Sequence, residues 1–308
     1  MRAAIIDLGT NTFNLIIAEN KGDTNYKLLY NKKIPVKLGE GRINESEIIP
    51  AAYKRGIEAI KKHFTKIKEY EVDTVKAFGT SALRTAANGP DFLKELHDIT
   101  NIEVSTISGD REAELISKGV VQTINFGESP FLILDIGGGS NEFIITTKNK
   151  VLWKKSYPLG IARLLARFKP SDPITGQELE VIKEYILTEL DGLFPIIRKY
   201  KIENLVGASG SFETFNAMIN RLDGETEVSL EPIATKLETD KFKELFEKLI
   251  HSTYQEREQM PGLEKMRIEM IVLAIYFVKV VLDNSNISSI FQSNFALKEG
   301  ALIELFNN

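Results

Sequence analysis

Two similar loops, one in each half of the chain, constrain the fold most strongly. The first reads DLGTN at residues 7–11, and the second reads DIGGGS at residues 135–140. Each begins with an aspartate at the end of an apolar run and leads into another apolar segment. Short apolar runs bounded by glycine are typical of buried β-strands. This internal repeat therefore predicts two related lobes, each beginning with a strand, a tight loop and a returning strand.

The rest of the sequence alternates between strand and helix patterns, which indicates an α/β protein. In the first half, we predict strands at 3–8, 13–19, 26–34, 75–79 and 102–107, and helices at 47–70, 81–87, 90–99 and 111–125. In the second half, we predict strands at 131–136, 143–147, 151–157, 204–206 and 287–291, and helices at 176–200, 211–220, 240–250, 265–282 and 296–306.

The chain length also favours two domains. At roughly 100–200 residues per domain, 308 residues are enough for two. We expect lobe I to cover residues 1–124 and to be completed by the C-terminal helix at 293–308. Lobe II is expected to cover residues 125–292, with the functional site in the cleft between the lobes.

Charge and composition exclude some classes of binding partner and some kinds of functional site. The net charge of −4 and the pI of about 5.7 do not favour nonspecific binding to nucleic acid or to an anionic membrane. The chain has no cysteine, which excludes disulfides, thiolate metal sites and a cysteine nucleophile. The apolar run at 270–282 is shorter than the roughly 20 residues of a membrane span. No secretory signal is recognisable, so we expect a cytoplasmic protein without a membrane segment.

The glycine-containing loops have the composition of phosphate-binding turns. Glycine allows close approach of a ligand to the backbone, and successive backbone N–H groups in a turn can bind an anion. A third such segment, GASG at residues 207–210, precedes a predicted helix whose N-terminus also favours phosphate. Each has an ordinary alternative, a plain β-hairpin for the first loops and a serine helix cap for the third. No phosphate-binding GxxxxGK[ST] string is present.

Carboxylates beside these loops are candidates for a divalent metal. Asp135 and Glu142 flank the second loop, and Asp7 stands at the mouth of the first. Oxygen ligands of this kind suit Mg²⁺ and Mn²⁺ alike. The sequence therefore predicts a metal site but leaves the metal open.

Seven segments together resemble one family across essentially the whole chain. They are AIIDLGTNT at 4–12, GTSALR at 79–84, ISGDREAEL at 107–115, LDIGGGSNE at 134–142, GASG at 207–210, MPGL at 260–263 and ALKEG at 296–300. Their order resembles the superfamily of actin, sugar kinases and heat-shock ATPases. Within it, they are similar to exopolyphosphatases and guanosine pentaphosphate phosphatases. This resemblance implies two actin-like, ribonuclease H-like lobes with an interdomain active-site cleft.

The resemblance also implies roles for individual residues. Glu112 falls on the catalytic glutamate of the family, which would activate the attacking water. Without the resemblance it reads as an ordinary carboxylate in a helix first turn. Asp135 and Glu142 match positions associated with the metal. The phosphate- and substrate-binding positions are Thr10, Asn11, Arg84, Gly137, Gly138, Gly139, Ser140, Gly207, Ser209, Gly210 and Arg267. The alternative for Arg84 is a surface salt bridge, and for Arg267 an ion pair with Glu264 or Glu269.

Two residues depart from the family pattern. Arg111 stands at the first glutamate position beside Glu112, and we expect its charge to favour the ionised form of Glu112. Lys298 stands where the family often has arginine. Lysine lacks the planar guanidinium that can bind two oxygens at once. Longer relatives carry a further helical region with a His-Asp motif, whereas the last residue of this chain is Asn308. We therefore expect action on short polyphosphate or on a nucleotide.

The expected activity is metal-dependent hydrolysis that releases terminal phosphate from inorganic polyphosphate, guanosine pentaphosphate or both. Four cations, Lys32, Lys33, Lys37 and Arg42, are candidates for a track that binds a polyphosphate chain, with a solvated face as the alternative. A phosphotransferase of the same superfamily and a nucleotide- or polyphosphate-binding regulatory protein remain as alternatives. Phosphate release without an acceptor would separate hydrolysis from transfer. A homodimer is expected for the family.

Overall fold

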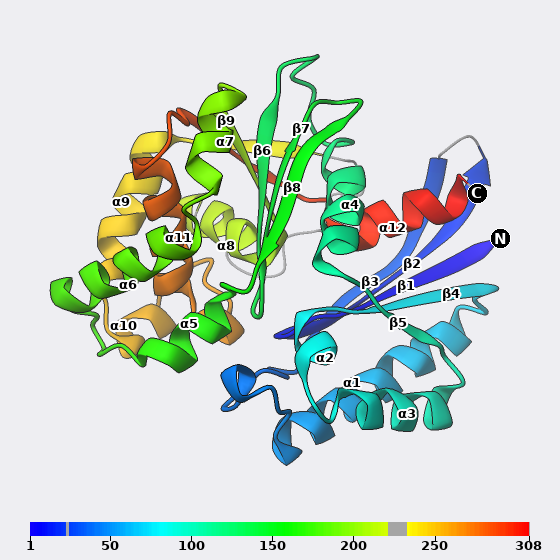
Figure 1. Cartoon of the computed structure of the whole chain (residues 1–308). Coiled ribbons are helices and arrows are strands. Elements are labelled where there is room, and N and C mark those ends of the chain that lie inside the picture. Colours follow the sequence, from blue (N-terminus) through cyan, green and yellow to red (C-terminus); the bar gives the residue numbers. More distant parts are fainter. Residues whose placement is uncertain (23–24, 221–232, 308) are drawn as a thin grey trace.

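Two β-sheets, one from each half of the chain, form the frame of the molecule (Figure 1). A computed structural model describes residues 1–22, 25–220 and 233–307. The first sheet has the strand order β3-β2-β1-β4-β5, and the second has the order β10-β11-β9-β6-β7-β8. The strands of the first sheet are β1 (Arg2–Leu8), β2 (Thr12–Gly22), β3 (Asn25–Pro35), β4 (Thr74–Gly79) and β5 (Val104–Thr106). Those of the second are β6 (Phe131–Ile136), β7 (Asn141–Thr146), β8 (Val151–Tyr157), β9 (Asn204–Ala208), β10 (Ala234–Leu237) and β11 (Ser289–Ser293).

The two sheets repeat one topology. In the first, β1, β2 and β3 form an antiparallel meander, and β4 and β5 continue the sheet in parallel with β1. In the second, β6, β7 and β8 form the meander, and β9 and β11 continue in parallel with β6. The antiparallel β10 is added at the edge. This repeat confirms the predicted α/β fold with two actin-like, ribonuclease H-like lobes.

Helices cover both sheets and also lie between them (Figure 1). The first lobe carries the 3₁₀ turn η1 (Ile43–Glu45) and the helices α1 (Pro50–Glu69), α2 (Ser81–Thr85) and α3 (Gly89–Thr100), followed by α4 (Gly109–Val120). The later elements are α5 (Ile161–Phe168), α6 (Gly176–Glu189), α7 (Leu193–Lys199), α8 (Ser209–Asn220), α9 (Thr239–Ile250), α10 (Tyr254–Glu258), the 3₁₀ turn η2 (Lys265–Arg267), α11 (Ile271–Asp283) and α12 (Leu297–Phe306). Within the described residues, no helix is long and apolar enough to cross a membrane.

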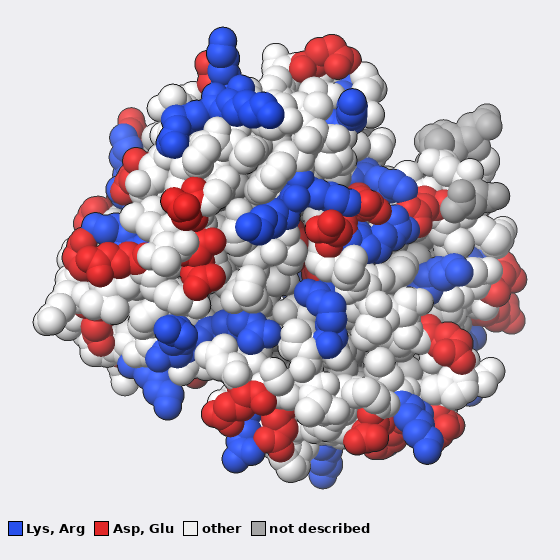
Figure 2. Space-filling model, in the orientation of Figure 1, with Lys and Arg blue, Asp and Glu red and all other residues white. Residues whose placement is uncertain are grey.

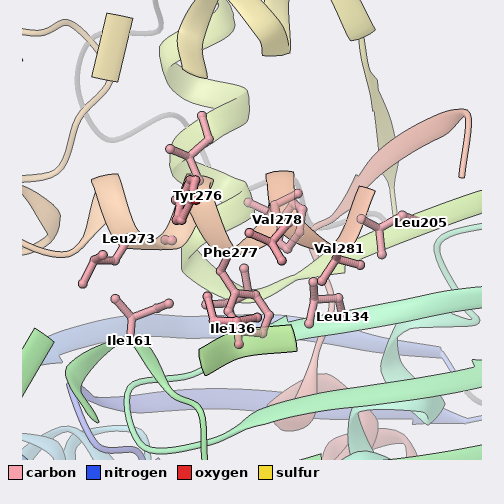
Figure 3. Packing of buried hydrophobic residues seen from close by; sticks show 14 of the residues in the cluster. Leu134, Ile136, Ile161, Leu205, Leu273, Tyr276, Phe277, Val278 and Val281 are labelled. Carbon is pink, nitrogen blue, oxygen red and sulfur yellow. The ribbon is translucent and has the colours of Figure 1, made fainter. Parts of the chain in front are cut away.

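Three apolar clusters hold these layers together. One lies within each lobe, and in the second lobe it forms around α11, where Phe277 points toward Ile136 on the sheet (Figure 3). The third joins the lobes, because it combines Ile5 of β1 with Ile133 of β6 and with side chains of α4 and α12. The predicted boundary near residue 125 stays a prediction, since α4 packs against strands of the second sheet.

The helices α4 and α12 cross closely enough to require glycine at the contact. A Cβ atom at Gly300 would collide with the carbonyl of Leu115, and one at Gly119 would collide with the carbonyl of Ala296. Glycine lets helix backbones approach each other directly. The crossing places the start of α12, with Lys298, near the ends of the strands that carry the predicted site.

Several predicted elements differ from the structure for physical reasons. The helix predicted at 176–200 is two helices, because the ring of Pro195 would clash with the carbonyl four residues earlier in a continuous helix. The helix predicted at 265–282 begins only at Ile271, after the turn η2. The helix predicted to start at Ser211 starts at Ser209. The periodicity gave no indication of α5, α10 or β10, which are 8, 5 and 4 residues long.

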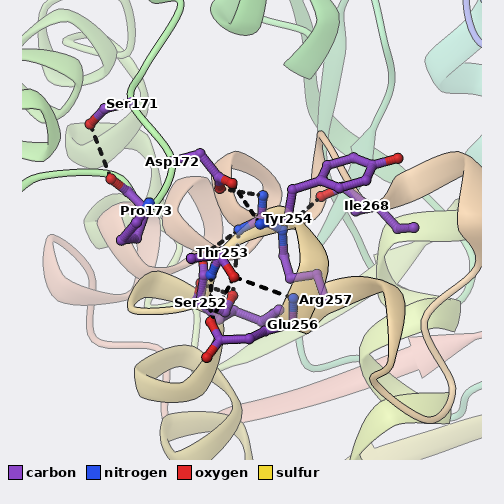
Figure 4. Close-up of polar contacts among 10 residues, drawn as sticks. Ser171, Asp172, Pro173, Ser252, Thr253, Tyr254, Glu256, Arg257 and Ile268 are labelled. Carbon is purple, nitrogen blue, oxygen red and sulfur yellow. Dashed lines mark hydrogen bonds and ion pairs between the residues drawn. The ribbon is translucent and has the colours of Figure 1, made fainter.

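A buried arginine holds the segment before α11 in place (Figure 4). Arg257 is 5% exposed, and its Nε donates to the carbonyl of Ile268 at 3.0 Å. Its Nη2 contacts Oδ1 of Asp172 at 2.7 Å, and its Nη1 donates to the carbonyl of Ser252. The other oxygen of Asp172 accepts from the backbone N–H of Tyr254 at 2.6 Å. These contacts connect the segment after η2 to the loop before α6. They also hold Ile268, which lies between η2 and α11.

We expect Arg257→Leu to destabilise the protein by about 2–3 kcal/mol. The substitution leaves two buried carbonyls without their charged donor. The free energy of unfolding, measured by urea denaturation, tests this expectation, with the exposed Arg198→Leu as the control. A loss no larger than that of the control would contradict the structural role of Arg257.

Candidate active site

The two predicted loops form the same tight turn. In the first, the backbone N–H of Gly9 donates to the carbonyl of Thr12 at 3.0 Å. In the second, the backbone N–H of Gly137 donates to the carbonyl of Ser140 at 3.1 Å. Each turn joins two antiparallel strands, β1 to β2 and β6 to β7. The repeat in the sequence is therefore also a repeat in backbone geometry.

These loops pack directly against side chains of the opposite lobe. A Cβ atom at Gly138 would lie 2.6 Å from Nδ2 of Asn11, and one at Gly139 would lie 2.5 Å from Oγ of Ser81 and 2.8 Å from Oγ1 of Thr10. A side chain at either position would displace Asn11, Ser81 or Thr10, so glycine keeps these side chains in contact with the loop backbone. Polar side chains of the first lobe occupy the space in front of these Cα atoms, and binding of a ligand to the loop backbone stays a prediction.

The third segment joins β9 to α8 and contributes polar groups to the same place. Ser209 takes a left-handed conformation with a φ of 64°. Its hydroxyl donates to Oδ2 of Asp135 at 2.7 Å. The Cα of Gly210 lies against the guanidinium of Arg267, which leaves no room for a larger residue. Arg267 also pairs with Glu264 at 2.8 Å, as its alternative interpretation expected.

A cavity of about 140 Å³ lies where these segments meet. It is lined by most of the residues that the sequence singled out, namely Asp7, Thr10, Asn11, Glu112, Asp135, Gly137, Gly138, Gly139, Ser140, Glu142, Ser209, Gly210 and Arg267. Two predicted residues lie outside its lining. Gly207 is buried within β9 against the ring of Phe212. Arg84 lies behind Glu112 and contacts its carboxylate.

Strand register explains why the carboxylates meet. In the β1–β2 pair, Asp7 lies opposite Asn14, whose Nδ2 donates to Oδ2 of Asp7 at 2.9 Å. At the matching place in the second lobe, Asp135 lies opposite Glu142. Residues directly opposite each other on neighbouring strands share a face of the sheet. Asp135 and Glu142 therefore form one acidic wall of the cavity.

Burial makes it unfavourable to ionise these groups. It raises the pKa of Asp7 to about 6, against the hydrogen bond from Asn14. Burial and the nearby charge of Glu142 raise the pKa of Asp135 to about 7. Burial also raises the pKa of Glu142, although the hydroxyl of Ser156 donates to it at 2.7 Å. This end of the cavity therefore gathers acidic groups in a place with little water to stabilise their ionised forms.

Glu112 stands in the first turn of α4, between the acidic wall and Arg84. Its side chain is 11% exposed, and Nη1 of Arg84 contacts its Oε2 at 3.3 Å. The same nitrogen donates to the carbonyl of Ile107 at 2.7 Å, which fixes the guanidinium. Burial raises the pKa of Glu112 well above its usual value, the charge of Glu142 adds to the rise, and Arg84 opposes it. An exposed acidic residue in a helix first turn does not fit this burial.

The predicted effect of Arg111 on Glu112 is wrong. The guanidinium of Arg111 binds Glu304 of α12, and it contacts Glu114 at 3.2 Å. Successive residues of a helix do not face each other, so Arg111 points away from the cavity while Glu112 points into it. The cation that contacts Glu112 is Arg84.

The other end of the cavity carries positive charge around a glutamate that the sequence analysis missed. Glu213 of α8 accepts a hydrogen bond from Nζ of Lys33 at 3.0 Å. Burial acts to raise the pKa of Glu213, yet Lys33, Lys298 and Arg267 lower it to about 2. Lys298 also pairs with Glu299 at 2.8 Å. No motif marks Glu213 in the sequence, so only the fold identifies it.

Three of the four cations predicted to form a track are paired with carboxylates. Lys33 is paired with Glu213 and, at 3.3 Å, with Glu264. Lys37 pairs with Glu269 at 2.8 Å, and Arg42 pairs with Glu45 at 3.3 Å. Lys and Arg side chains are interspersed with Asp and Glu across the face that Figure 2 shows.

The donor set of the acidic end fits a hard divalent cation. Its groups are carboxylates and hydroxyls, and a cation would relieve the mutual repulsion that raises their pKa values. Among the described residues, no three Asp, Glu or His side chains are grouped so that they could hold a metal alone. This arrangement suits Mg²⁺, which is usually bound by one or two carboxylates together with water and substrate phosphates. Asp135 and Glu142 would hold it, with Asp7 nearby.

Comparison with known families agrees with this geometry. The model of the Ppx/GppA phosphatase family matches residues 16–308. The chain belongs to the Ppx/GppA phosphatase family. A crystal structure of an exopolyphosphatase from Cytophaga hutchinsonii is similar, with 34% identity, a TM-score of 0.95, and coverage of 100% of this chain and 98% of that one. The predicted membership of a family of hydrolases is confirmed.

Two further relatives extend the comparison. The Aquifex aeolicus PPX-GPPA enzyme shares the fold at 24% identity, with a TM-score of 0.79 and coverage of 99% of both chains. The guanosine-5'-triphosphate,3'-diphosphate pyrophosphatase of Photobacterium profundum is 27% identical over 99% of this chain. The chain spans 59% of the length of that relative.

We expect Asp135→Asn to stabilise the metal-free protein at pH 7.5 but not at pH 4. An unfolded chain ionises aspartate near pH 4, whereas folded Asp135 ionises near pH 7. The folded form binds the proton more tightly, so the free energy of unfolding of the wild type falls as the pH rises from 4 to 7. Each unit of pKa corresponds to about 1.4 kcal/mol, so the gain at pH 7.5 is on the order of a few kcal/mol.

Urea denaturation with a chelator present, at pH 4 and pH 7.5, measures this difference. The exposed Asp98→Asn is the matched control. Equal stability of wild type and Asp135→Asn at both pH values would show that the buried carboxylate carries no such cost.

Proposed function

We propose that the protein hydrolyses the terminal phosphoanhydride of inorganic polyphosphate by direct attack of water. The observation that carries this proposal is the position of Glu112. Its buried carboxylate shares one cavity with both glycine loops and with the acidic wall. Burial raises the pKa of Glu112 well above its usual value, which makes its ionised carboxylate a stronger base toward water. Family membership supports the same chemistry.

In this reaction, Glu112 accepts a proton from the attacking water as the water oxygen bonds to the terminal phosphorus. The bridging P–O bond breaks, and its electron pair stays on the shortened chain. The ion pair with Arg84 fixes the carboxylate, and a free N–H of this guanidinium could bind a phosphate oxygen. Hydroxyls of Thr10, Ser140 and Ser209 line the cavity and would orient the terminal phosphate.

A divalent metal held at Asp135 and Glu142 would supply positive charge to the phosphate oxygens in the transition state. Ser209 and Ser156 hold these two carboxylates in position through hydrogen bonds of 2.7 Å each. Neutral hydroxyl donors orient the carboxylates without cancelling their charge. We propose Mg²⁺ or Mn²⁺ as this metal.

The lining of the cavity favours a polyphosphate chain over a nucleotide. Among the described residues that line it, none is aromatic, and apolar contact is limited to Ile136, Leu297 and the small Ala296. Lys33, Lys298 and Arg267 at the far end offer cations to the remaining phosphates once these compete with Glu213. Guanosine pentaphosphate contains the same terminal anhydride and is the alternative substrate.

We expect Glu112→Gln to lower kcat for phosphate release from short-chain polyphosphate by roughly 10²- to 10⁴-fold. The glutamine keeps the shape but cannot accept the proton. Glu114→Gln is the control, because it lies on the same helix and faces Lys154 and Arg111 instead of the cavity.

Phosphate release is measured with Mg²⁺ from polyphosphate and from guanosine pentaphosphate in parallel, without any acceptor. Turnover of the nucleotide alone would reassign the substrate. Equal activity of Glu112→Gln and wild type, or no release from either compound, would refute the proposed mechanism.

We expect Mg²⁺ to raise the thermal unfolding midpoint of the wild type, because a ligand that binds only the folded state stabilises it. The rise should be largely lost in Asp135→Asn, which removes a carboxylate from the acidic wall. Differential scanning calorimetry with and without Mg²⁺ measures it without requiring activity. A rise of the same size in both proteins would place the metal elsewhere.

A further inference from the structure

A second cavity of about 430 Å³ lies between the lobes beside the first. Its walls come from α2, from the start of α4, from the second glycine loop, from the end of β8 and from α5. Two of its residues are arginines, Arg84 and Arg163, and most of the others carry hydroxyl groups. The hydrolysis proposed above uses this cavity only through Arg84, so its other groups have no assigned role.

Arg163 makes no ion pair in the part of the chain that the structure describes. Its Nε donates to the carbonyl of Gly139 at 2.8 Å, its Nη1 to the carbonyl of Ile43 at 3.0 Å, and its Nη2 to Oγ1 of Thr85 at 3.3 Å. All three acceptors are neutral. Burial and the charge of Arg84 both lower the pKa of Arg163, against a smaller opposing effect of Tyr185. A partly buried cation without a counter-charge is unfavourable, and an anion in the cavity would supply the missing charge.

Other groups around the cavity are also suited to an anion. Gly109 and Asp110, the first two residues of the 12-residue helix α4, line the cavity, and backbone N–H groups in a helix first turn have no partner within the helix. Ser81, Thr85, Ser108 and Ser156 add hydroxyls. Asp110 also lines the cavity, and its negative charge works against an anion. Arg84 is shared with Glu112, so Arg163 supplies the positive charge that no carboxylate of the described residues pairs with.

The two cavities meet at the catalytic position. Ser81 and Ser140 line both of them. Glu112 lines the first, and Arg84, its ion-pair partner, lines the second. The second cavity therefore adjoins the first at the side of Glu112 where Arg84 lies.

We propose that the second cavity is a binding site for inorganic phosphate, which receives the orthophosphate product on the side of Glu112 away from the remaining chain. The role of the site as a product site rests on the proposed hydrolysis. The ability of the cavity to bind an anion does not depend on that reaction. The acidic wall of the first cavity repels a free phosphate, whereas Arg84 and Arg163 attract it. The shortened chain keeps its contacts at Lys33, Lys298 and Arg267, so product and chain leave by different routes.

Equilibrium binding of inorganic phosphate tests the site without turnover. Isothermal titration calorimetry is run on the full chain at pH 7.5 with a chelator, because the first cavity then has no metal to attract phosphate. We expect Arg163→Gln to weaken phosphate binding by at least about tenfold, since a charge-assisted contact is lost. Arg163→Lys, which keeps the charge, should lose less. Arg167→Gln is the matched control, because Arg167 is exposed on the same helix and packs over Phe168 and Tyr185.

Binding by Arg163→Gln with the affinity of the wild type would overturn the proposal, as would absence of phosphate binding by the wild type. Arg163 also joins α5 to η1 and α2, so the glutamine variant could fail to fold. In that case, phosphate binding is compared between the wild type and Arg163→Lys. The rise of the thermal unfolding midpoint with phosphate is measured for the wild type and for Arg167→Gln, and no rise in the wild type would overturn the proposal.

Steady-state kinetics then tests whether the anion bound in the second cavity is the product or part of the substrate. If the cavity holds product, Arg163→Gln raises the inhibition constant of phosphate about tenfold and changes KM for polyphosphate much less. A rise in KM without a change in the inhibition constant would place substrate there and refute the proposal. Phosphate binding that depends on Arg163, in a protein that releases no phosphate, would refute the proposed hydrolysis and leave the anion site intact.

Discussion

The side chains of Asn11, Thr10 and Ser81 fill the space in front of Gly138 and Gly139. This contact joins the two lobes at the point where both sheets present their carboxylates. Because the glycines have no side chain, the second loop contacts these side chains without displacing them. The positions of the acidic wall and of the cavity depend on this approach. The crossing of α4 and α12 at Gly119 and Gly300 makes a second close contact and brings Lys298 to the same cavity.

Charge is separated along the site. One end holds Asp135 and Glu142, which are buried and resist ionisation, and the other holds Lys33, Lys298 and Arg267 around Glu213. A linear polyanion bound along this axis would place its cleaved end at the carboxylates only with a divalent cation present. The second cavity adds positive charge on the far side of Glu112. In the proposed reaction, the substrate chain extends toward the cations around Glu213, and the released phosphate enters the second cavity.

Much of the architecture was predictable from local pattern, because both sheets begin with strongly apolar strands followed by glycine turns. The internal repeat marked the two lobes, and the motifs marked Glu112, Asp135 and the loops. Local pattern failed where a single residue changed the outcome. Pro195 divides a helix that the periodicity joined, and Arg257 holds a turn where the apolar pattern continued. The homodimer, the cytoplasmic location and the identity of the metal stay predictions.

Along the chain alone, spacing and residue type were sufficient for two α/β lobes and for the glycine loops with their carboxylates, because these depend on patterns that repeat within a few residues. The roles predicted for Glu112 and Arg267 came from the family resemblance. Spacing and residue type did not predict which side chains contact each other in the folded protein. Neither the orientation of Arg111 toward Glu304, nor the cluster of cations around Glu213, nor the unpaired charge of Arg163 is visible in the sequence. Each depends on which elements pack together across the lobes. Electrostatic environment is a property of that packing, and only the tertiary structure decides it.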